Sequence, residues 1–492
     1  MKKWTIWCLA PLLLLLYTTC FSPLNNKDNG ETTLSVTLPG ISPGISKAVG
    51  VPDLLEYEIS GTGPRGKSFA ETASGGTTAT ITIVPGLWRV KIRAYDPLDL
   101  TKTNEADSEF YDIDIKAGKN NNLPVQMRFV QIAPIVNYLN AVGGTLANPA
   151  SLHIAVPLDS TAWNDLLTAL DSTPYYVDLD LSACTRGTST GLEGLDSNGV
   201  FDPDSGVVIG KDKIVSLVLP DAADSIADWD GSNPTFNGFI NLLSLDTSTM
   251  ITVIGDNAFE GIGLYSVIIG NKVMTIGDWA FSNNNLTSVI IPNNVIQIGM
   301  AAFSNNNLIS VTIGNSIITI GNGAFMSNQL PNVTIPNSVT TIGPWAFDDN
   351  QLITITIPDS VTILGESAFS RNQLSSITIP DSIIVIEQQM FTANNLASIT
   401  IPNSVIAINA RAFANNQLST LIIPDSITTI EDEVFVINPL TSVTIGANVT
   451  LSTHATRTTF DGDLDDVYNM GGQLAGTYTR PTASSPNWTK EP

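Results

Sequence analysis

Residues able to support acid–base or metal chemistry are few in this chain of 492 residues, and they lie far apart. The two histidines, His153 and His454, stand in unrelated regions without a catalytic motif around either. No HExxH, GxSxG or P-loop pattern occurs, and no Cys/His cluster has zinc-ligand spacing. No carboxylate pair suited to glycan hydrolysis is identifiable. We therefore expect a protein that is not an enzyme, with no catalytic residue, no metal and no cofactor.

The most acidic segment, residues 461–466 (DGDLDD), resembles a calcium loop only loosely. It lacks the glycine and the distal glutamate at the places where an EF-hand needs them. We interpret it as an acidic loop that faces solvent near the end of the fold. Asp178, Asp180 and Asp196 are interpreted in the same way, as solvated charges of strands and loops.

One cysteine stands where covalent modification is expected. Lys2 and Lys3 precede an apolar run over residues 6–17, which is too short for a membrane span of about 20 residues. Cys20 follows directly and resembles the lipobox cysteine of bacterial lipoproteins, although Tyr17 and Thr19 depart from the usual pattern. The resemblance implies a signal peptide over 1–19, a lipid on Cys20 and a polar tether over 20–30. The alternative is an ordinary signal peptide with an incidental cysteine.

The composition favours a folded, acidic protein with more than one domain. The chain is 43% hydrophobic and only 14% charged, so global disorder is not expected. Its formal net charge of −24 repels phosphate backbones and argues against nucleic-acid partners. If Cys8 is removed with the signal and Cys20 is lipidated, only Cys184 remains, and one thiol forms no internal disulfide.

A 22-residue repeat is the strongest signal in the sequence. Leu stands five residues after each repeated Phe, Ile stands five before it with Leu364 as the one exception, and Val, Ile or Leu stands eight after it. A fixed spacing between about 20 and 29 residues is typical of a leucine-rich solenoid, in which stacked coils share one core. We expect the repeated phenylalanines to form an aromatic spine: Phe259, Phe281, Phe303, Phe325, Phe347, Phe369, Phe391, Phe413 and Phe435.

The pattern within one unit predicts which side chains point inward. Val333 and Ile335 alternate with Asn332 and Thr334, as expected for a short strand with one buried face. Gly343 is predicted to release the backbone into a tight bend before the next Phe. Asn also recurs three residues after the Phe in eight units, from Asn284 to Asn438. We favour an asparagine ladder that satisfies backbone groups over a row of ligand contacts.

The outward strand positions form a lattice of hydroxyl and amide groups on a sparsely charged face. A rigid surface of this kind loses little entropy on binding and could match an extended partner or a glycan. The alternative is that Ser and Thr simply suit exposed strands. The candidate binding residues are Asn332, Thr334, Thr354, Thr356, Ser376, Thr378, Ser398 and Thr400.

Two units, residues 335–347 (IPNSVTTIGPWAF) and 357–369 (IPDSVTILGESAF), resemble the BspA-like leucine-rich repeats. The resemblance is strong over 250–450 and weak over 170–250. Many members of that family have Cys where this chain has Asn. Together with the loose lipobox, the tail around 468–480 and Trp488 points to a treponeme-like surface lipoprotein. The resemblance implies adhesion to host matrix proteins or to other bacteria.

We predict a mainly β fold, with a small N-terminal β-sandwich followed by a leucine-rich-repeat solenoid of about nine regular 22-residue coils. The period-two alternation over 31–130 suggests six or seven strands of an immunoglobulin-like or transthyretin-like module. Residues 131–250 are predicted to be an irregular N-terminal capping region with degenerate repeats and one helix over 159–170, for which Thr161 is the candidate cap. The repeats occupy 251–450, and 451–492 forms a C-terminal cap segment.

Two functions remain open at this point. The first is a lipid-anchored protein exposed on the outer membrane of a bacterial cell envelope, which adheres to extracellular protein or glycan ligands. The second is an internal envelope scaffold without a host ligand. Exposure of the repeats to external protease on intact cells would distinguish them.

Overall fold

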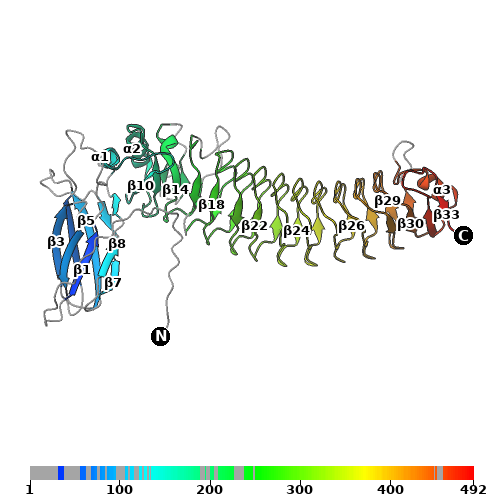
Figure 1. Ribbon diagram of the computed structural model, residues 1–492, viewed down its shortest axis with the longest axis horizontal. Coiled ribbons are helices and arrows are strands. Elements are labelled where there is room, and N and C mark those ends of the chain that lie inside the picture. Colours follow the sequence, from blue (N-terminus) through cyan, green and yellow to red (C-terminus); the bar gives the residue numbers. More distant parts are fainter. Residues whose placement is uncertain are drawn as a thin grey trace.

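The chain is an elongated rod in the computed structural model, with an N-terminal pair of β-sheets at one end and a stack of coils that runs to the C-terminus (Figure 1). Cys20, His454 and Asp196 lie outside the described residues, so the signal peptide and the lipid anchor stay predictions. The structure describes residues 32–37, 56–62, 68–74, 78–83, 86–95, 106–108, 111–115, 121–124, 127–129, 132, 135–188, 194–195, 200–203, 209–226, 236, 238–247, 250–447, 449–451 and 458–492.

The N-terminal part contains nine strands in two sheets, two or three more strands than the alternation predicted. One sheet has the order β4-β1-β8, and the other has the order β3-β2-β5-β6-β9 with β7 paired to β5. Only the β1–β8 pairing among these strands is parallel. The strands are β1 (Thr32–Thr37), β2 (Glu56–Thr62), β3 (Ser68–Ser74), β4 (Thr78–Ile83), β5 (Gly86–Tyr95), β6 (Ala106–Ser108), β7 (Tyr111–Ile115), β8 (Asn121–Pro124) and β9 (Met127–Phe129).

The region before the regular repeats already stacks like them. Its strands β10, β11, β14 and β16 pair in parallel and lead into the first repeat strand β18. Helix α2 is capped by Asp159, whose side chain accepts a hydrogen bond from the Ala162 N–H, so the prediction of Thr161 as the cap was wrong. The elements are α1 (Ile135–Val142), β10 (Ala150–His153), α2 (Ser160–Asp171), β11 (Val177–Asp180), β12 (Gly194–Leu195), β13 (Val200–Asp202), the 3-10 helix η2 (Lys211–Lys213), β14 (Ile214–Val218), β15 (Ser225–Ile226) and β16 (Ser244–Asp246).

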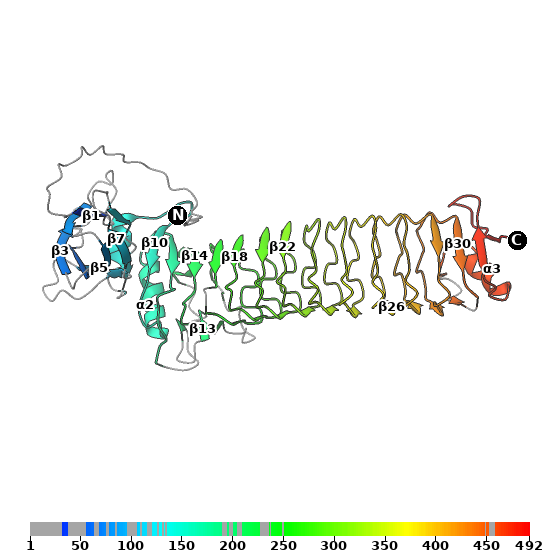
Figure 2. The same ribbon diagram turned by 90° about the horizontal axis from the view of Figure 1, so that it is seen from below.

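The coils that follow contribute to two rows of short parallel strands. Figure 2 separates the rows: β14, β18, β22 and β30 follow one side of the rod, while β13 and β26 follow the other. The first row contains β18 (Ser266–Ile268), β20 (Ser288–Ile290), β22 (Ser310–Thr312), β28 (Thr420–Ile422) and β30 (Ser442–Ile445). The second contains β17 (Val253–Ile254), β19 (Thr275–Ile276), β21 (Gln297–Ile298), β23 (Thr319–Ile320), β24 (Thr341–Ile342), β25 (Ile363–Leu364), β26 (Val385–Ile386), β27 (Ala407–Ile408), β29 (Thr429–Ile430) and β31 (Thr450–Leu451).

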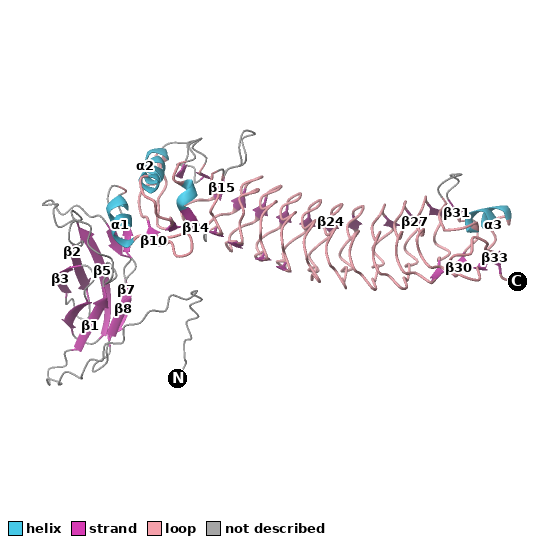
Figure 3. Ribbon diagram, turned by 45° about the horizontal axis from the view of Figure 1, so that its top comes forward, coloured by secondary structure: helices cyan, strands magenta, loops and turns pink. Residues whose placement is uncertain are grey.

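Most of each coil between these strands is turn and loop (Figure 3), and this part is highly regular. In each of the nine coils, the residues two before and two after the repeated Phe adopt positive φ. Only Gly261 and Gly323 are glycines at these positions, and side chains such as Trp345 occupy the rest. Gly343, by contrast, does not have a positive φ. The predicted turn does follow it, with the Ala346 N–H donating to the Gly343 oxygen, but glycine is required here because an added Cβ would lie 2.5 Å from the Asn322 Oδ1 of the preceding coil.

Replacing Ile437 by Asn is expected to stabilise the protein by about 1 kcal/mol, because a β-branched residue is strained at positive φ. Ile437 has φ 57° and is 66% exposed, so little packing is lost. Asn415 holds the equivalent place one coil earlier with φ 56°. Asn415→Ile should therefore produce a loss of similar size. Chemical denaturation measures the change in the free energy of unfolding for both variants. Equal stability of Ile437→Asn and the parent chain would contradict the strain argument.

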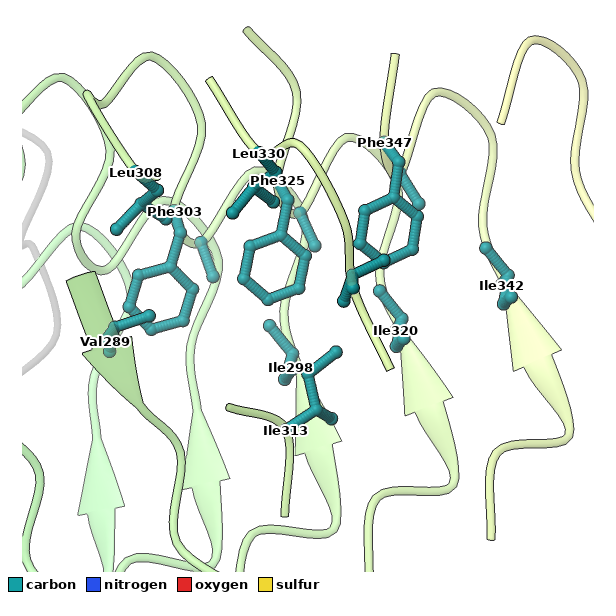
Figure 4. Packing of buried hydrophobic residues seen from close by; sticks show 14 of the residues in the cluster. Val289, Ile298, Phe303, Leu308, Ile313, Ile320, Phe325, Leu330, Ile342 and Phe347 are labelled. Carbon is teal, nitrogen blue, oxygen red and sulfur yellow. The ribbon is translucent and has the colours of Figure 1, made fainter. Parts of the chain in front are cut away.

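The predicted aromatic spine is present and fully buried. The rings of adjacent coils stack with centroids 5.1–6.0 Å apart, for example 5.4 Å between Phe325 and Phe347. In Figure 4 the rings of Phe303, Phe325 and Phe347 follow one another in a row, with the leucine and isoleucine side chains of the same coils around them. The row extends beyond the nine repeats, since Phe460 stacks on Phe435 at one end and the tilted ring of Phe236 packs against Phe259 at the other.

The asparagine ladder is also present. Asn394 is 5% exposed, and its Nδ2 donates to the carbonyl oxygen of Phe369 in the preceding coil at 2.9 Å and to that of Phe391 in its own coil at 3.2 Å. Its Oδ1 accepts a hydrogen bond from the Leu374 N–H at 2.9 Å. The same pattern recurs in all eight units that carry this residue. The amide row is therefore structural and satisfies backbone groups that the turns leave unpaired.

The C-terminal segment closes the stack. Strand β32 (Gly476–Thr479) pairs antiparallel with β30 and with β33 (Thr489–Lys490), and α3 spans Leu464–Met470. Asp465 is 4% exposed and accepts hydrogen bonds from the N–H groups of Thr459 and Phe460, so the interpretation of this acidic run as a solvated loop was wrong. Burial raises the pKa of Asp465 to about 6. Within the described ranges, no helix is both long and apolar enough to span a membrane.

Candidate functional site

The eight candidate binding residues lie together on the first strand row and are all exposed. We call them the candidate face: Asn332, Thr334, Thr354, Thr356, Ser376, Thr378, Ser398 and Thr400. Thr334, Thr356, Thr378 and Thr400 pair in parallel from coil to coil, which places their side chains in one line. Adjacent strands are about 4.8 Å apart. The sequence pattern thus correctly predicted which side chains share this surface, although nothing yet tests binding by them.

The strand segments that contain the candidate face carry no charge. Residues 251–450 contain 13 acidic and 3 basic residues, and none lies in the seven-residue segment from four to ten positions after a repeated Phe. This segment contains the strand of the first row, so the charges lie in the turns and on the second row. The strand segments themselves therefore offer a partner no ion-pair donor or acceptor, and the nearest acids in sequence, such as Asp359 and Asp381, stand in the turns that follow.

The polar groups of the candidate face have no hydrogen-bond partner within the described chain. None of its eight side chains donates to or accepts from another described residue. Threonines directly before three second-row strands behave differently, because the hydroxyls of Thr340, Thr362 and Thr428 donate to backbone carbonyls of the preceding coil. The Oγ1 of Thr428 lies 3.1 Å from the Ile406 oxygen, and that of Thr340 lies 3.4 Å from the Ile318 oxygen. Hydrogen-bonding capacity on the first row is thus left for solvent or a ligand.

A second set of amides, which sequence reasoning missed, borders the candidate face. Residues four positions after the Phe are Asn or Gln in seven consecutive coils, three positions before the outward strand residues. The Gln329 Nε2 donates to the Asn307 Oδ1 at 3.1 Å, so neighbouring side chains align along the rod. In the sequence, these residues are visible as a second periodic amide, one position after the asparagines of the buried ladder. We call these residues the amide row: Asn285, Asn307, Gln329, Gln351, Gln373, Asn395 and Gln417.

The second strand row presents a more apolar surface. Several of its outward side chains are between 41% and 59% exposed although they are aliphatic. They fall into two groups, separated by Thr340 and Thr362. Nothing in the structure shows what covers these side chains: Met274, Ile296, Ile318, Ile363, Ile384 and Ile406.

One buried carboxylate affects the stability of the rod. Asp348 is 2% exposed, and its only ion-pair partner, Arg371, is 57% exposed. Its Oδ1 has no hydrogen-bond partner. Burial raises the pKa of Asp348 from its ordinary 3.8 to about 6, although the Arg371 guanidinium lowers it. Between those two pH values the folded state binds more protons than the unfolded state, so its stability falls as pH rises.

Asp348→Asn is therefore expected to raise the free energy of unfolding at pH 7 by about 1–2 kcal/mol. The parent chain should gain stability as pH falls from 7 towards 5, and the variant should lack much of that gain. Denaturation at a series of pH values measures both effects. Asp381→Asn, at an exposed turn position, serves as the control. A variant that is less stable than the parent at pH 7 would show that the Arg371 ion pair outweighs the cost of burial.

The histidine that the sequence left without a role forms a hydrogen bond with an acid. The His153 Nδ1 lies 2.8 Å from the Asp180 Oδ2 on the neighbouring strand. Although burial raises the pKa of Asp180, the hydrogen bonds from His153 and Ser182 lower it to about 2. Asp178 on the same strand has a raised pKa because of burial. Both acids are half-buried, contrary to the prediction of solvated charges. In the described part of the chain, no group of three or more His, Cys, Asp or Glu residues could hold a metal ion.

Comparison with known families identifies the repeats. Residues 231–354 and 346–456 match the BspA type leucine rich repeat region, in six copies. Residues 231–456 are a BspA-type leucine-rich repeat region. This confirms the family resemblance of the two quoted units, and the two-row coil is the BspA-type repeat of this chain. The prediction of a mainly β fold with a repeat solenoid is likewise confirmed. Solenoids of this kind serve protein interaction.

The chain is similar to several solved structures at low sequence identity. A leucine-rich repeat protein from Bacteroides ovatus is 18% identical over 46% of this chain and 78% of that one, with a TM-score of 0.31. A leucine rich cell surface protein from Faecalibacterium prausnitzii is 21% identical over 54% and 77%, with a TM-score of 0.31. The pneumococcal vaccine antigen PcpA is 22% identical over 54% and 79%, with a TM-score of 0.36. No curated protein matches the chain.

Proposed function

We propose that this protein is a lipid-anchored component of the bacterial cell envelope that displays its solenoid outside the cell and adheres to an extracellular protein or glycan. The observation that carries the proposal is the candidate face, an exposed and uncharged row whose side-chain polar groups have no hydrogen-bond partner among the described residues. Stacked coils hold such a face rigid, so little entropy is lost when a ligand binds. Many anchored copies would add avidity to a weak single-site affinity.

The anchor is the part of the proposal that rests on sequence. Cys20 follows an apolar run of lipobox type, and residues 20–30 would tether the folded part to the membrane. The N-terminal sheets lie between this tether and the coils in the chain, so they would act as a spacer. Replacement of Cys20 by Ser should release the protein from the membrane fraction into the soluble fraction. A Cys20→Ser variant that stays in the membrane fraction would rule out lipidation at this residue.

Protease treatment of intact cells tests the surface location. The repeats should be digested while a periplasmic marker stays intact, as followed with an antibody against residues 251–450. Survival of the repeats until the outer membrane is broken would favour an internal scaffold over an adhesin. Binding of the purified protein to host cells or matrix proteins then tests adhesion itself, with a repeat-deleted chain as the control.

A further inference from the structure

The candidate face and the amide row lie side by side and share an unusual chemistry. Both consist of neutral hydrogen-bonding side chains, and neither contains an acid or a base. In protein–protein interfaces, Trp, Tyr and Arg supply most of the binding energy. The outward strand positions of the nine coils contain none of these residues, and Tyr265 stands just before the strand of the first coil. The centre of the face therefore lacks the anchors that a protein partner would need.

We propose that the candidate face and the amide row bind an uncharged, extended polysaccharide, which lies along the rod and crosses successive coils. The proposal rests on the proposed function and names the ligand class of the same surface. A neutral polysaccharide carries hydroxyl groups that both donate and accept, and primary amides and hydroxyls do the same. The absence of charge matches a ligand without charge, whereas an acidic glycan would need bases that this surface does not contain.

The geometry of the rows suits a polymer. Thr334, Thr356, Thr378 and Thr400 repeat at a strand spacing of about 4.8 Å, which is close to the length of one pyranose residue in an extended chain. These four coils can thus offer similar groups to successive sugar residues, each with one threonine and one amide-row residue. Ile309 and Ile353, which are 59% and 51% exposed, stand beside the strands and provide apolar contact for the C–H faces of the rings. The contact area then grows with the length of the polymer.

Residues whose hydroxyls form no internal hydrogen bond are expected to contribute to binding. Thr356 and Thr378 form no side-chain hydrogen bond within the described chain, so removal of their hydroxyls should cost binding and little stability. The matched control lies on the second row, where Thr362 and Thr428 are equally exposed. Their hydroxyls donate to backbone carbonyls at 3.5 and 3.1 Å. Threonine to valine preserves shape and strand preference in all four places.

The experiment is co-sedimentation of the purified full-length protein with insoluble cellulose, chitin and mannan, with heparin and polygalacturonate as charged comparators. We expect binding to at least one neutral polymer that survives high salt, because no ion pair contributes. The double variant Thr356→Val/Thr378→Val should bind about tenfold more weakly, which corresponds to about 1.4 kcal/mol. The double variant Thr362→Val/Thr428→Val should bind like the parent.

Several outcomes would overturn the proposal. They are binding to none of the neutral polymers, binding only to the charged comparators, or equal loss in both double variants. If the neutral polymers fail while the protein still adheres to cells or to a matrix protein, the ligand class is wrong and the proposed function stands. If the repeats prove inaccessible on intact cells while neutral polysaccharide binds in vitro, the polysaccharide proposal stands and the adhesin does not.

Discussion

Phe347→Ala is expected to lower the free energy of unfolding of the solenoid by about 3–5 kcal/mol. The ring is fully buried and stacks on Phe325 at 5.4 Å and on Phe369 at 5.7 Å. Its removal leaves a cavity in the middle of the core, where neighbouring coils cannot collapse because their own turns are held by the asparagine ladder. Chemical denaturation followed by circular dichroism measures the loss.

Phe347→Leu is the control for shape, since it keeps most of the apolar volume and should cost less than about 1.5 kcal/mol. Because each coil contacts only its neighbours, hydrogen exchange in Phe347→Ala should rise first in the coils around residue 347. Uniform exchange along the rod would instead show that the solenoid unfolds as one unit. A loss below about 1 kcal/mol for Phe347→Ala would mean that the spine is not the main source of core stability.

The repeat allowed much of this structure to be predicted, because the same residue pattern recurs in all nine coils. The burial of Val333, the exposure of Thr334 and the stacking of the phenylalanines all follow from period and alternation. The ladder also followed from the pattern, since an amide at a fixed place in a turn meets the same backbone groups in each coil. The family was recognisable for the same reason.

Features that depend on single contacts were not predictable. Phe460 extends the spine, but it follows Phe435 by 25 residues and so breaks the period. The positive φ values on either side of the Phe escaped notice because Trp, Arg and Ile occupy positions where Gly is the usual sign. Asp465 was expected in solvent, since nothing in a run of acids announces that one of them accepts two backbone hydrogen bonds.

The candidate face required both the sequence and the structure. Sequence alone placed the Ser, Thr and Asn residues on one surface, but it could not say whether their hydroxyls were already used. That question depends on distances to backbone carbonyls, and the answer differs between Thr356 on the first row and Thr428 on the second. The amide row was equally visible in the sequence and was overlooked because it is adjacent to the buried ladder.

Asn394→Asp is the second change with a large expected effect, a loss of about 3–5 kcal/mol at pH 7. The substitution keeps the shape and the oxygen that accepts from Leu374, but it removes both N–H donors. A carboxylate would then face the carbonyl oxygens of Phe369 at 2.9 Å and Phe391 at 3.2 Å in a buried site. Each carbonyl oxygen would keep one amide donor, Asn372 at 3.2 Å for Phe369 and Asn416 at 2.9 Å for Phe391, so repulsion by the buried carboxylate is the main cost.

The neighbouring residue gives a matched control, because Asn395 is exposed and Asn395→Asp should change stability by less than about 0.5 kcal/mol. The buried carboxyl should have a folded-state pKa above its unfolded value. Stability of Asn394→Asp should therefore recover in part as pH falls through that folded-state pKa, since the protonated acid can donate one of the lost hydrogen bonds. Thermal unfolding of both variants at pH 4 and pH 7 tests this. Equal losses for the two variants would mean that the buried amide contributes no more than an exposed one, and the ladder would then not be what holds the turns of adjacent coils together.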